Sequence, residues 1–439
     1  MASWRNVLNP SLAAAAVAAA KDVAFRLQDP ELLQRAINNI RQQTQTSVYD
    51  TDPAASCYAG HAGAALLFSE LDRRFPTEGW DVAGHHCMQV AVCSVKRSSW
   101  SPRRLGLGAL SGLLFVTWSL SHGETRYLRT LTALEQQALP AIRTVAENVI
   151  ADQVHGCTES LYDHISGLTG MGVHLLCRRH VPAVTETLEA VLQALIYLAE
   201  ETDGIPHWYI PSYLSDPGWL SKFPHGHLNC GLAHGIPGPL ALLSLAKSSG
   251  IHVPSLDMTI RRIADWVVAH HRADTWGIDW PNASPPGDAP VESGTTRTAW
   301  CYGIPGVARA LWLAGKAVDC TTYRDVALLG MRSVYRRSVE ARRLDPSGFC
   351  HGIAGLLQIT LRFAAETGDT CFIEPVNTLC EQMLANYEPE TLLGYRARRI
   401  GGDLLDDPGL LNGAAGNALV LLAASTPHEP TWDRFFLLS

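Results

Sequence analysis

The chain has 439 residues, of which 47% are hydrophobic and 18% charged, so it is able to bury a large core. Its 35 basic and 42 acidic residues give a formal net charge of −7 and are mixed along the sequence, which argues against a nucleic-acid-binding surface. No run reaches the ~20 apolar residues of a membrane span. The eleven cysteines are an odd number spread singly, which favours a reducing, cytoplasmic compartment.

An alanine-rich run at positions 13–20 follows Arg5 near the N-terminus. The run lacks leucine, and Lys21 and Asp22 continue a helical pattern. We therefore expect a helix here and not a secretory signal peptide. Helices are expected to dominate the rest of the chain as well, because long β-rich runs are absent.

Seven segments share the form small-x-x-Gly followed by an apolar run. Their final glycines lie 49 to 68 residues apart, a spacing that fits a repeat of two helices with their loops. The segments are 60–63, 109–112, 167–170, 235–238, 303–306, 352–355 and 413–416. In the second of them Ala109 replaces the first glycine. For the copies at 60, 109 and 413, we expect only a helix start with no function attached.

Each repeat is expected to contain one buried helix and one amphipathic helix. The runs after the turns, such as 240–246 and 418–424, are apolar on nearly all sides, which predicts burial. Amphipathic segments lie between them, at 184–201, 256–271 and 324–342. The first and last copies lack the polar face of a capping repeat. We therefore predict one all-α domain over residues 1–439, a closed α/α toroid with seven inner and seven outer helices.

Metal-binding side chains gather just before the first glycine of consecutive repeats. His234 precedes the fourth motif, Cys301 and Tyr302 the fifth, and Cys350 and His351 the sixth. If the repeats stack in one orientation, these side chains converge. Two cysteines and one histidine with an open fourth position are typical of a catalytic zinc site, and helix N-termini favour the thiolate that such a site needs. Taken singly, a buried cysteine is more often an ordinary small apolar residue.

Other polar residues lie near these motifs, and each has a plainer explanation. Asp163 precedes the third motif, and its plainer explanation is a helix N-cap. For Arg297 the plainer explanation is a charged residue on the surface. His225 and His227 lie outside the repeat register and are expected to be loop residues. The segment 271–298 is rich in Pro, Gly and Asp, which predicts a long loop that acts as a lid or substrate rim.

Three motifs together resemble the LanC family of lanthipeptide cyclases. They are GLAHG at 231–235, WCYG at 300–303 and CHG at 350–352. The resemblance covers most of the chain, because all seven repeats have counterparts in the toroid of that family. It is closer to stand-alone class I cyclases than to the cyclase half of a fused synthetase, because no kinase-like or dehydratase-like domain precedes the repeats. Tyr302 in the Cys-x-Gly motif favours the bacterial peptide cyclases.

The resemblance implies a zinc enzyme that acts on a peptide. The implied Zn²⁺ ligands are Cys301, Cys350 and His351, with water as the fourth ligand. The implied acid/base residues are His234 and Asp163, and Arg297 and Tyr302 match positions near the metal. The implied reaction is a Michael-type addition of cysteine thiols to dehydroalanine or dehydrobutyrine in a dehydrated precursor peptide, leader plus core. The product is lanthionine or methyllanthionine, and a dehydratase and a transporter are the implied partners.

Three other interpretations remain open at this point. A zinc prenyltransferase or a terpene cyclase also uses an α/α barrel. The prenyltransferase, however, binds zinc with Asp, Cys and His, and the terpene cyclase binds its metal with a cluster of acidic residues. The only Asp pair in this sequence is Asp406-Asp407. A LanC-like protein that binds glutathione without catalysis is a second alternative. A helical scaffold without a site is the third, and it leaves the grouped Cys and His residues unexplained.

Overall fold

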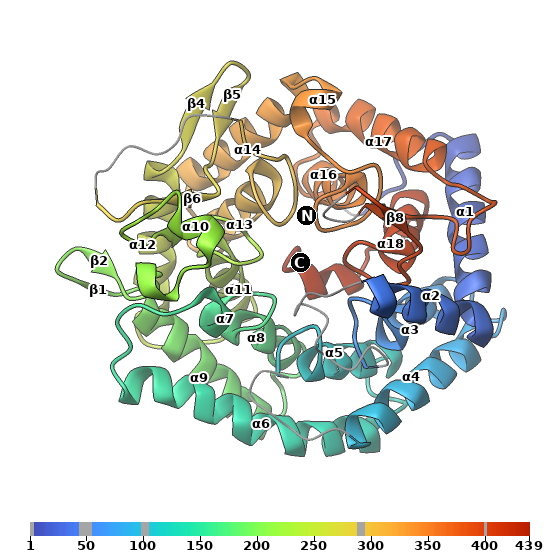
Figure 1. The fold of residues 1–439 in the computed structure, drawn as a ribbon, viewed down its shortest axis with the longest axis horizontal. Helices are drawn as coiled ribbons and strands as arrows, with labels where there is room; N and C mark the ends of the chain where they lie inside the picture. The colour runs from blue at the N-terminus through green and yellow to red at the C-terminus, as the bar shows by residue number, and fades with distance from the viewer. Residues whose placement is uncertain (1–3, 44–54, 98–104, 288–294, 399–401) are drawn as a thin grey trace. The chain divides into compact units, whose positions relative to one another are not determined.

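The computed structural model describes residues 4–43, 55–97, 105–287, 295–398 and 402–439. Helices dominate these residues, and the strands are only two or three residues long, which confirms the all-α prediction (Figure 1). Two compact units are present. The first contains residues 1–100, 108–131 and 344–436, and the second contains residues 101–107, 132–343 and 437–439.

Each of the seven predicted turns begins a helix, and these helices are buried along most of their length. All twelve residues of the last one are buried, as its apolar sequence predicts. The seven helices are α3 (His61–Arg74), α5 (Leu110–Leu120), α8 (Leu168–Cys177), α11 (Pro237–Ser248), α13 (Ile304–Ala317), α16 (Ile353–Thr367) and α18 (Ala414–Ser425).

At five of the seven motifs the final glycine is needed because the helix begins directly against its own preceding loop. A Cβ at Gly306 would lie 2.1 Å from the carbonyl oxygen of Trp300, and a Cβ at Gly170 would lie 2.1 Å from that of His164. Both carbonyls are six residues before the glycine, and no side chain tolerates such a distance. The same relation holds at Gly63, Gly238 and Gly416. The loop residues just before these five motifs therefore lie closely against the start of the helix.

In the second unit, amphipathic helices follow and pack against the buried ones. They are α9 (Pro182–Leu198) on α8, α12 (Leu256–Ala269) on α11 and α14 (Thr321–Arg336) on α13. The prediction of one helix over 324–342 is wrong. The chain leaves the helix at Arg337, and the side chain of Ser338 accepts a hydrogen bond from Ala341 N, which starts the separate helix α15 (Val339–Arg342).

A buried ionic cluster joins two helices of this unit. Glu135 lies in α6 (Leu128–Ala151), and its Oε1 is 2.9 Å from His174 Nε2 and accepts a hydrogen bond from Arg178 Nε at 2.9 Å. Burial raises the pKa of Glu135, but the hydrogen bonds from His174 and Arg178 outweigh it and lower the pKa to about 2. The carboxylate is therefore held charged between α6 and α8.

In the first unit, the beginning and the end of the chain share one core. Helix α1 (Pro10–Gln28), predicted from the alanine run, packs along α18 and beside α17 (Ile373–Ala385), as Figure 1 shows. Trp4 Nε1 donates to Ala423 O at 3.2 Å, and Leu410 N donates to Cys57 O at 3.1 Å. The unit also contains α2 (Pro30–Gln43) and α4 (Trp80–Arg97). The last repeat thus contacts the first within this unit.

The strands form four two-stranded antiparallel pairs among the described residues. The pairs are β1 (Glu201–Thr202) with β2 (Ile205–Pro206), β3 (Leu228–Asn229) with β6 (Ala283–Ser284), β4 (Arg272–Asp274) with β5 (Gly277–Asp279), and β7 (Ala397–Arg398) with β8 (Leu404–Leu405). The predicted loop over 271–298 therefore contains the β4–β5 hairpin and β6, and its residues 288–294 lie outside the described part. No helix in the described ranges has the length and apolar character needed to cross a bilayer.

Candidate active site

Three loops of the second unit are joined by backbone hydrogen bonds at the starts of α8, α11 and α13. His164 N donates to Ala233 O at 3.1 Å, and Ala233 N donates to Cys301 O at 3.3 Å. These bonds run between the loops of successive repeats. The predicted residues Asp163, His234, Cys301 and Tyr302 are the bonded residues themselves or their direct neighbours in the sequence, so the bonds bring them together.

His234 and Asp163 form a hydrogen-bonded pair. The distance from His234 Nδ1 to Asp163 Oδ2 is 2.6 Å, and the carboxylate accepts, so Nδ1 carries the hydrogen. The Asp163 side chain is 2% exposed, whereas that of His234 is 37% exposed, so the imidazole is within reach of a substrate. The bond fixes the ring orientation and leaves Nε2 as the atom available for proton transfer.

Asp163 also holds the loop before α8 with its other carboxylate oxygen. Asp163 Oδ1 accepts hydrogen bonds from Ser166 N at 2.7 Å and from Gly167 N at 2.8 Å. The N-cap of α8 is Gly167, without a side-chain cap, so the N-cap interpretation of Asp163 is wrong, and the carboxylate instead holds the loop that precedes the helix. Because two backbone N–H groups hold Oδ1, the direction of Oδ2 toward His234 is set by the start of α8.

The acidic surroundings of His234 control its charge. Burial lowers the pKa of His234, but the hydrogen bond and the charge of Asp163 outweigh burial, and the pKa lies above its ordinary value. Glu159, the first residue of α7 (Glu159–Tyr162), also favours the charged imidazole. The pKa of Glu159 itself is raised, chiefly by burial. Sequence reasoning did not single out Glu159, although its position one helical turn before Asp163 was a usable signal.

Tyr302 lies against the loop that carries His234. The centroids of the Tyr302 and His234 rings are 6.3 Å apart, and the Tyr302 hydroxyl accepts a hydrogen bond from Asn229 Nδ2 at 3.1 Å. Burial raises the pKa of Tyr302 far above its ordinary value, so the phenol keeps its proton. Tyr302 is thus a neutral hydrogen-bonding group beside the imidazole.

The predicted metal ligands occur at equivalent places in their repeats, two in the first unit and one in the second. Cys301 is 7% exposed and lies two residues before the Gly303 cap of α13. Cys350 lies two residues before the Gly352 cap of α16, and its N–H donates to Leu411 O at 2.7 Å. His351 Nε2 is 3.3 Å from Asp345 Oδ2. Asp345 was missed from the sequence because nothing in the repeat register marks it.

Arg297 lies in a segment that is anchored on both sides. Thr296 N donates to Asp279 Oδ2 at 3.1 Å, and Thr298 N donates to Arg342 O at 2.9 Å. Arg297 itself is partly exposed between these two anchors. The elements that hold this segment are strand β5 and helix α15, so the position of Arg297 depends on elements outside the fifth motif.

The two histidines expected to be loop residues differ in burial. His225 is exposed, whereas His227 is fully buried. The His227 ring stacks on Trp219 of α10 (Pro217–Leu220) with centroids 4.9 Å apart, and burial lowers its pKa to about 4. His227 is therefore a neutral packing residue, and its loop is more ordered than its sequence suggested.

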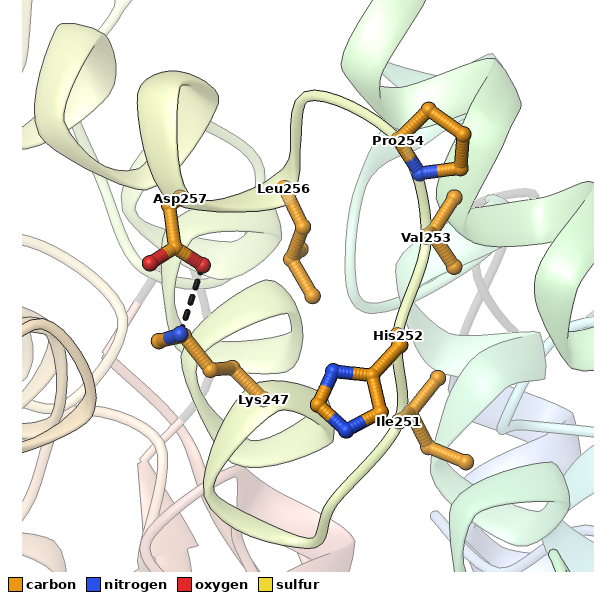
Figure 2. A pocket seen from close by; sticks show the side chains of 7 residues that line it. All are labelled: Lys247, Ile251, His252, Val253, Pro254, Leu256 and Asp257. Carbon is orange, nitrogen blue, oxygen red and sulfur yellow. Dashed lines mark ion pairs between the residues drawn. The ribbon is translucent and has the colours of Figure 1, made fainter.

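One surface pocket lies away from these residues, at the other end of α11 (Figure 2). Its volume is about 320 Å³, and an ion pair of 2.6 Å between Lys247 Nζ and Asp257 Oδ1 bridges its wall. The lining residues are Lys247, Ile251, His252, Val253, Pro254, Leu256 and Asp257. Because α11 separates this pocket from His234 by its full length, the pocket is not part of the candidate active site.

Comparisons with known proteins agree with these features. The profile of the family described as lanthionine synthetase C-like protein matches residues 52–437. The nisin biosynthesis protein NisC of Lactococcus lactis subsp. lactis is 24% identical over 345 residues, which cover 76% of this chain and 81% of that protein. A solved structure, nisin cyclase, has the same fold, with a TM-score of 0.74, 21% identity, and coverage of 92% of this chain and 96% of that chain.

The extent of the profile match settles the family. The chain belongs to the lanthionine synthetase C-like family, and with it to the class of lanthionine-forming cyclases that the three motifs predict. The predicted α/α toroid fold class is confirmed by the match to nisin cyclase.

Proposed function

We propose that this protein closes thioether rings in a dehydrated precursor peptide and depends on zinc for this reaction. A cysteine thiol of the peptide adds to the β-carbon of dehydroalanine or dehydrobutyrine. A C–S bond forms, the alkene electron pair moves to the α-carbon, and the thiol proton ends on that carbon. The observation that carries the proposal is the His234–Asp163 pair, held at 2.6 Å in two loops, one of which is hydrogen-bonded to the loop that bears Cys301 and Tyr302.

The proposed zinc ligands are Cys301, Cys350 and His351, which directly precede the motifs of two successive repeats. The donor chemistry fits zinc, because two thiolates and an imidazole leave a fourth position for a substrate. The contact from His351 Nε2 to Asp345 also fits, since metal-binding histidines usually engage a carboxylate with the nitrogen that does not bind the metal. When bound, the metal would supply the positive charge that lowers the pKa of a substrate thiol.

The proton transfers are assigned to His234. Its Nε2 is the open nitrogen, and Asp163 stabilises the imidazolium that forms when it accepts the thiol proton. The same imidazolium then returns a proton to the α-carbon after addition. Arg297 is proposed to stabilise the negative charge that develops on the substrate carbonyl oxygen, and Tyr302 is proposed to act beside it.

The metal assignment is tested by substitution and metal analysis. We expect Cys301→Ala and Cys350→Ala to lose most of their zinc, because only two ligands remain in each variant. His234→Ala is the matched control, since it removes no ligand and is expected to keep its zinc while ring formation is largely lost. Full zinc occupancy in both cysteine variants contradicts the ligand assignment.

Ring closure is measured on a peptide that carries one dehydroalanine and one cysteine. Addition leaves the peptide mass unchanged but consumes the thiol, so iodoacetamide labels only the open peptide. A thiol that disappears with this protein and persists with His234→Ala supports the proposal. Tight calorimetric binding of glutathione without any thiol consumption in the peptide would favour the non-catalytic thiol-binding alternative.

A further inference from the structure

A side-chain amide in β3 determines how the Tyr302 hydroxyl makes its hydrogen bonds. Asn229 is completely buried, and its Oδ1 accepts a hydrogen bond from Gly231 N at 3.1 Å. A backbone N–H can only donate, so this contact identifies which end of the amide is the oxygen. The amide nitrogen therefore faces Tyr302 and donates to the phenol oxygen at 3.1 Å.

This arrangement leaves the phenol hydrogen available for another group. An amide nitrogen does not accept hydrogen bonds, so Asn229 is unable to take the hydrogen of the Tyr302 hydroxyl. Within the part of the chain that the structure describes, the contact with Asn229 is the one hydrogen bond found for this hydroxyl. Tyr302 is also partly exposed, so a substrate group is able to reach it.

The loop around Asn229 holds both the phenol and the imidazole. A Cβ at Gly231 would lie 2.6 Å from Cδ1 and Cε1 of Tyr302, so the ring lies directly on the glycine backbone. Asn229 O accepts a hydrogen bond from Ile236 N at 3.2 Å, which closes the loop that contains His234. The positions of the phenol oxygen and of the imidazole are therefore linked by one short segment, 229–236.

We infer that Asn229 is a positioning residue that holds Tyr302 as a hydrogen-bond donor to the substrate carbonyl conjugated to the reacting alkene. That oxygen gains negative charge as sulfur adds to the β-carbon, and a donor already placed there stabilises the transition state. Removing such a donor typically lowers kcat about 10²- to 10³-fold. The inference rests on the proposed ring closure, because that reaction supplies the acceptor.

The test replaces the donor by an acceptor of the same shape. In Asn229→Asp, one carboxylate oxygen still accepts from Gly231 N, while the other captures the hydrogen of the Tyr302 hydroxyl. We expect kcat to fall at least about tenfold, toward the value of Tyr302→Phe. In the Tyr302→Phe background the same substitution is expected to change kcat less than about twofold, whereas a purely structural role would give equal losses in both backgrounds.

Two further variants keep the test valid if the buried carboxylate prevents folding. Asn229→Ala removes the donor without adding charge, and its loss of kcat is also expected to vanish in the Tyr302→Phe background. Asn282→Asp is the matched control, because Asn282 is an exposed asparagine on the neighbouring segment and makes the same change of charge in solvent. We expect its kcat to equal that of the unsubstituted protein.

A readout without substrate separates this inference from the proposed function. With 3-fluorotyrosine at position 302, the ¹⁹F resonance is expected to move in Asn229→Asp and to stay in place in Asn282→Asp. A resonance that does not move in Asn229→Asp, or equal losses of kcat in both backgrounds, would overturn the inference and leave the cyclase proposal intact. An unsubstituted protein that closes no ring in the peptide would instead overturn the proposed function, whatever the resonance does.

Discussion

The most informative substitution is Asp163→Asn, because the two oxygens of Asp163 have different partners. Oδ1 is held by two backbone N–H groups, which can only donate. In the variant the amide oxygen must therefore stay at this place, and the amide nitrogen must face His234. An amide nitrogen does not accept from His234 Nδ1, so the imidazole is forced into the tautomer that has its hydrogen on Nε2.

The expected magnitude follows from the bond that is lost. A hydrogen bond to a charged group is worth about 1.5–3 kcal/mol, which is about 10- to 150-fold in rate. The wrong tautomer adds to this loss, and the equivalent Asp-to-Asn change in a serine protease triad costs about 10⁴-fold. We therefore expect Asp163→Asn to lower kcat by about 10²- to 10⁴-fold, measured by the loss of peptide thiols over time.

Stability provides the control for this prediction. Asp163→Asn keeps an oxygen that accepts from Ser166 N and Gly167 N, so its free energy of unfolding in urea is expected to change by less than about 1 kcal/mol. Asp163→Ala leaves the two N–H groups of Ser166 and Gly167 without their acceptor and is expected to lose about 1–3 kcal/mol. The reasoning is refuted if Asp163→Asn keeps kcat within threefold, or if it is destabilised as much as Asp163→Ala.

The kcat/KM is expected to fall at low pH with a midpoint above 6.5, the ordinary pKa of histidine, because the pKa of His234 is raised. In Asp163→Asn this midpoint should move to lower pH. A midpoint that does not move would exclude His234 as the titrating group. The same raised pKa stabilises the fold fully below the unfolded value and loses this contribution as the pH rises through the folded value. Gly306→Ala should lower the free energy of unfolding in urea by about 1–3 kcal/mol, because its Cβ meets a carbonyl oxygen at 2.1 Å. Gly218→Ala, with open space around the new Cβ, should lower it by less than about 0.5 kcal/mol. Equal urea midpoints for the two variants would disprove this packing argument. The pKa of Glu135 is lowered to about 2, so the stability it contributes is present above the unfolded pKa and should be lost as the pH falls toward 2. Glu135→Gln should therefore flatten the dependence of the unfolding midpoint on pH below 5. A pH dependence equal to that of the unsubstituted protein would contradict this prediction.

The repeat was predictable from the sequence because its signal is local. The spacing from glycine to glycine specifies a helix start, and all seven predicted starts are helix starts in the structure. His234 was indicated by the register because it directly precedes its motif, but its pairing with Asp163 was not, since Asp163 lies four residues before Gly167. By contrast, the break after Arg336 was missed because the capping hydroxyl of Ser338 lies within a pattern that is otherwise helical.

The parts of the site that were missed come from outside the register. Asn229 contacts Tyr302 across 73 positions of the sequence, and no pattern within either segment indicates the contact. Asp345 lies 3.3 Å from His351 across a turn in which Phe349 N and Cys350 N donate to Leu411 O of the next repeat. Positioning residues such as Asn229 and Asp345 are therefore harder to identify from one sequence than the residues they contact. Asn and Asp are common residue types, and only the folded structure shows where these two lie.

The packing of α1 along α18 has a consequence for biosynthesis. During translation, the first helix leaves the ribosome long before its partner exists, because the contact of Trp4 with Ala423 spans 419 positions. Most of the second unit, residues 132–343, is contiguous and is synthesised before α18, although residues 437–439 of that unit come last. The first unit has to wait for residues 344–436, and until then the buried face of α1 lacks its packing partner.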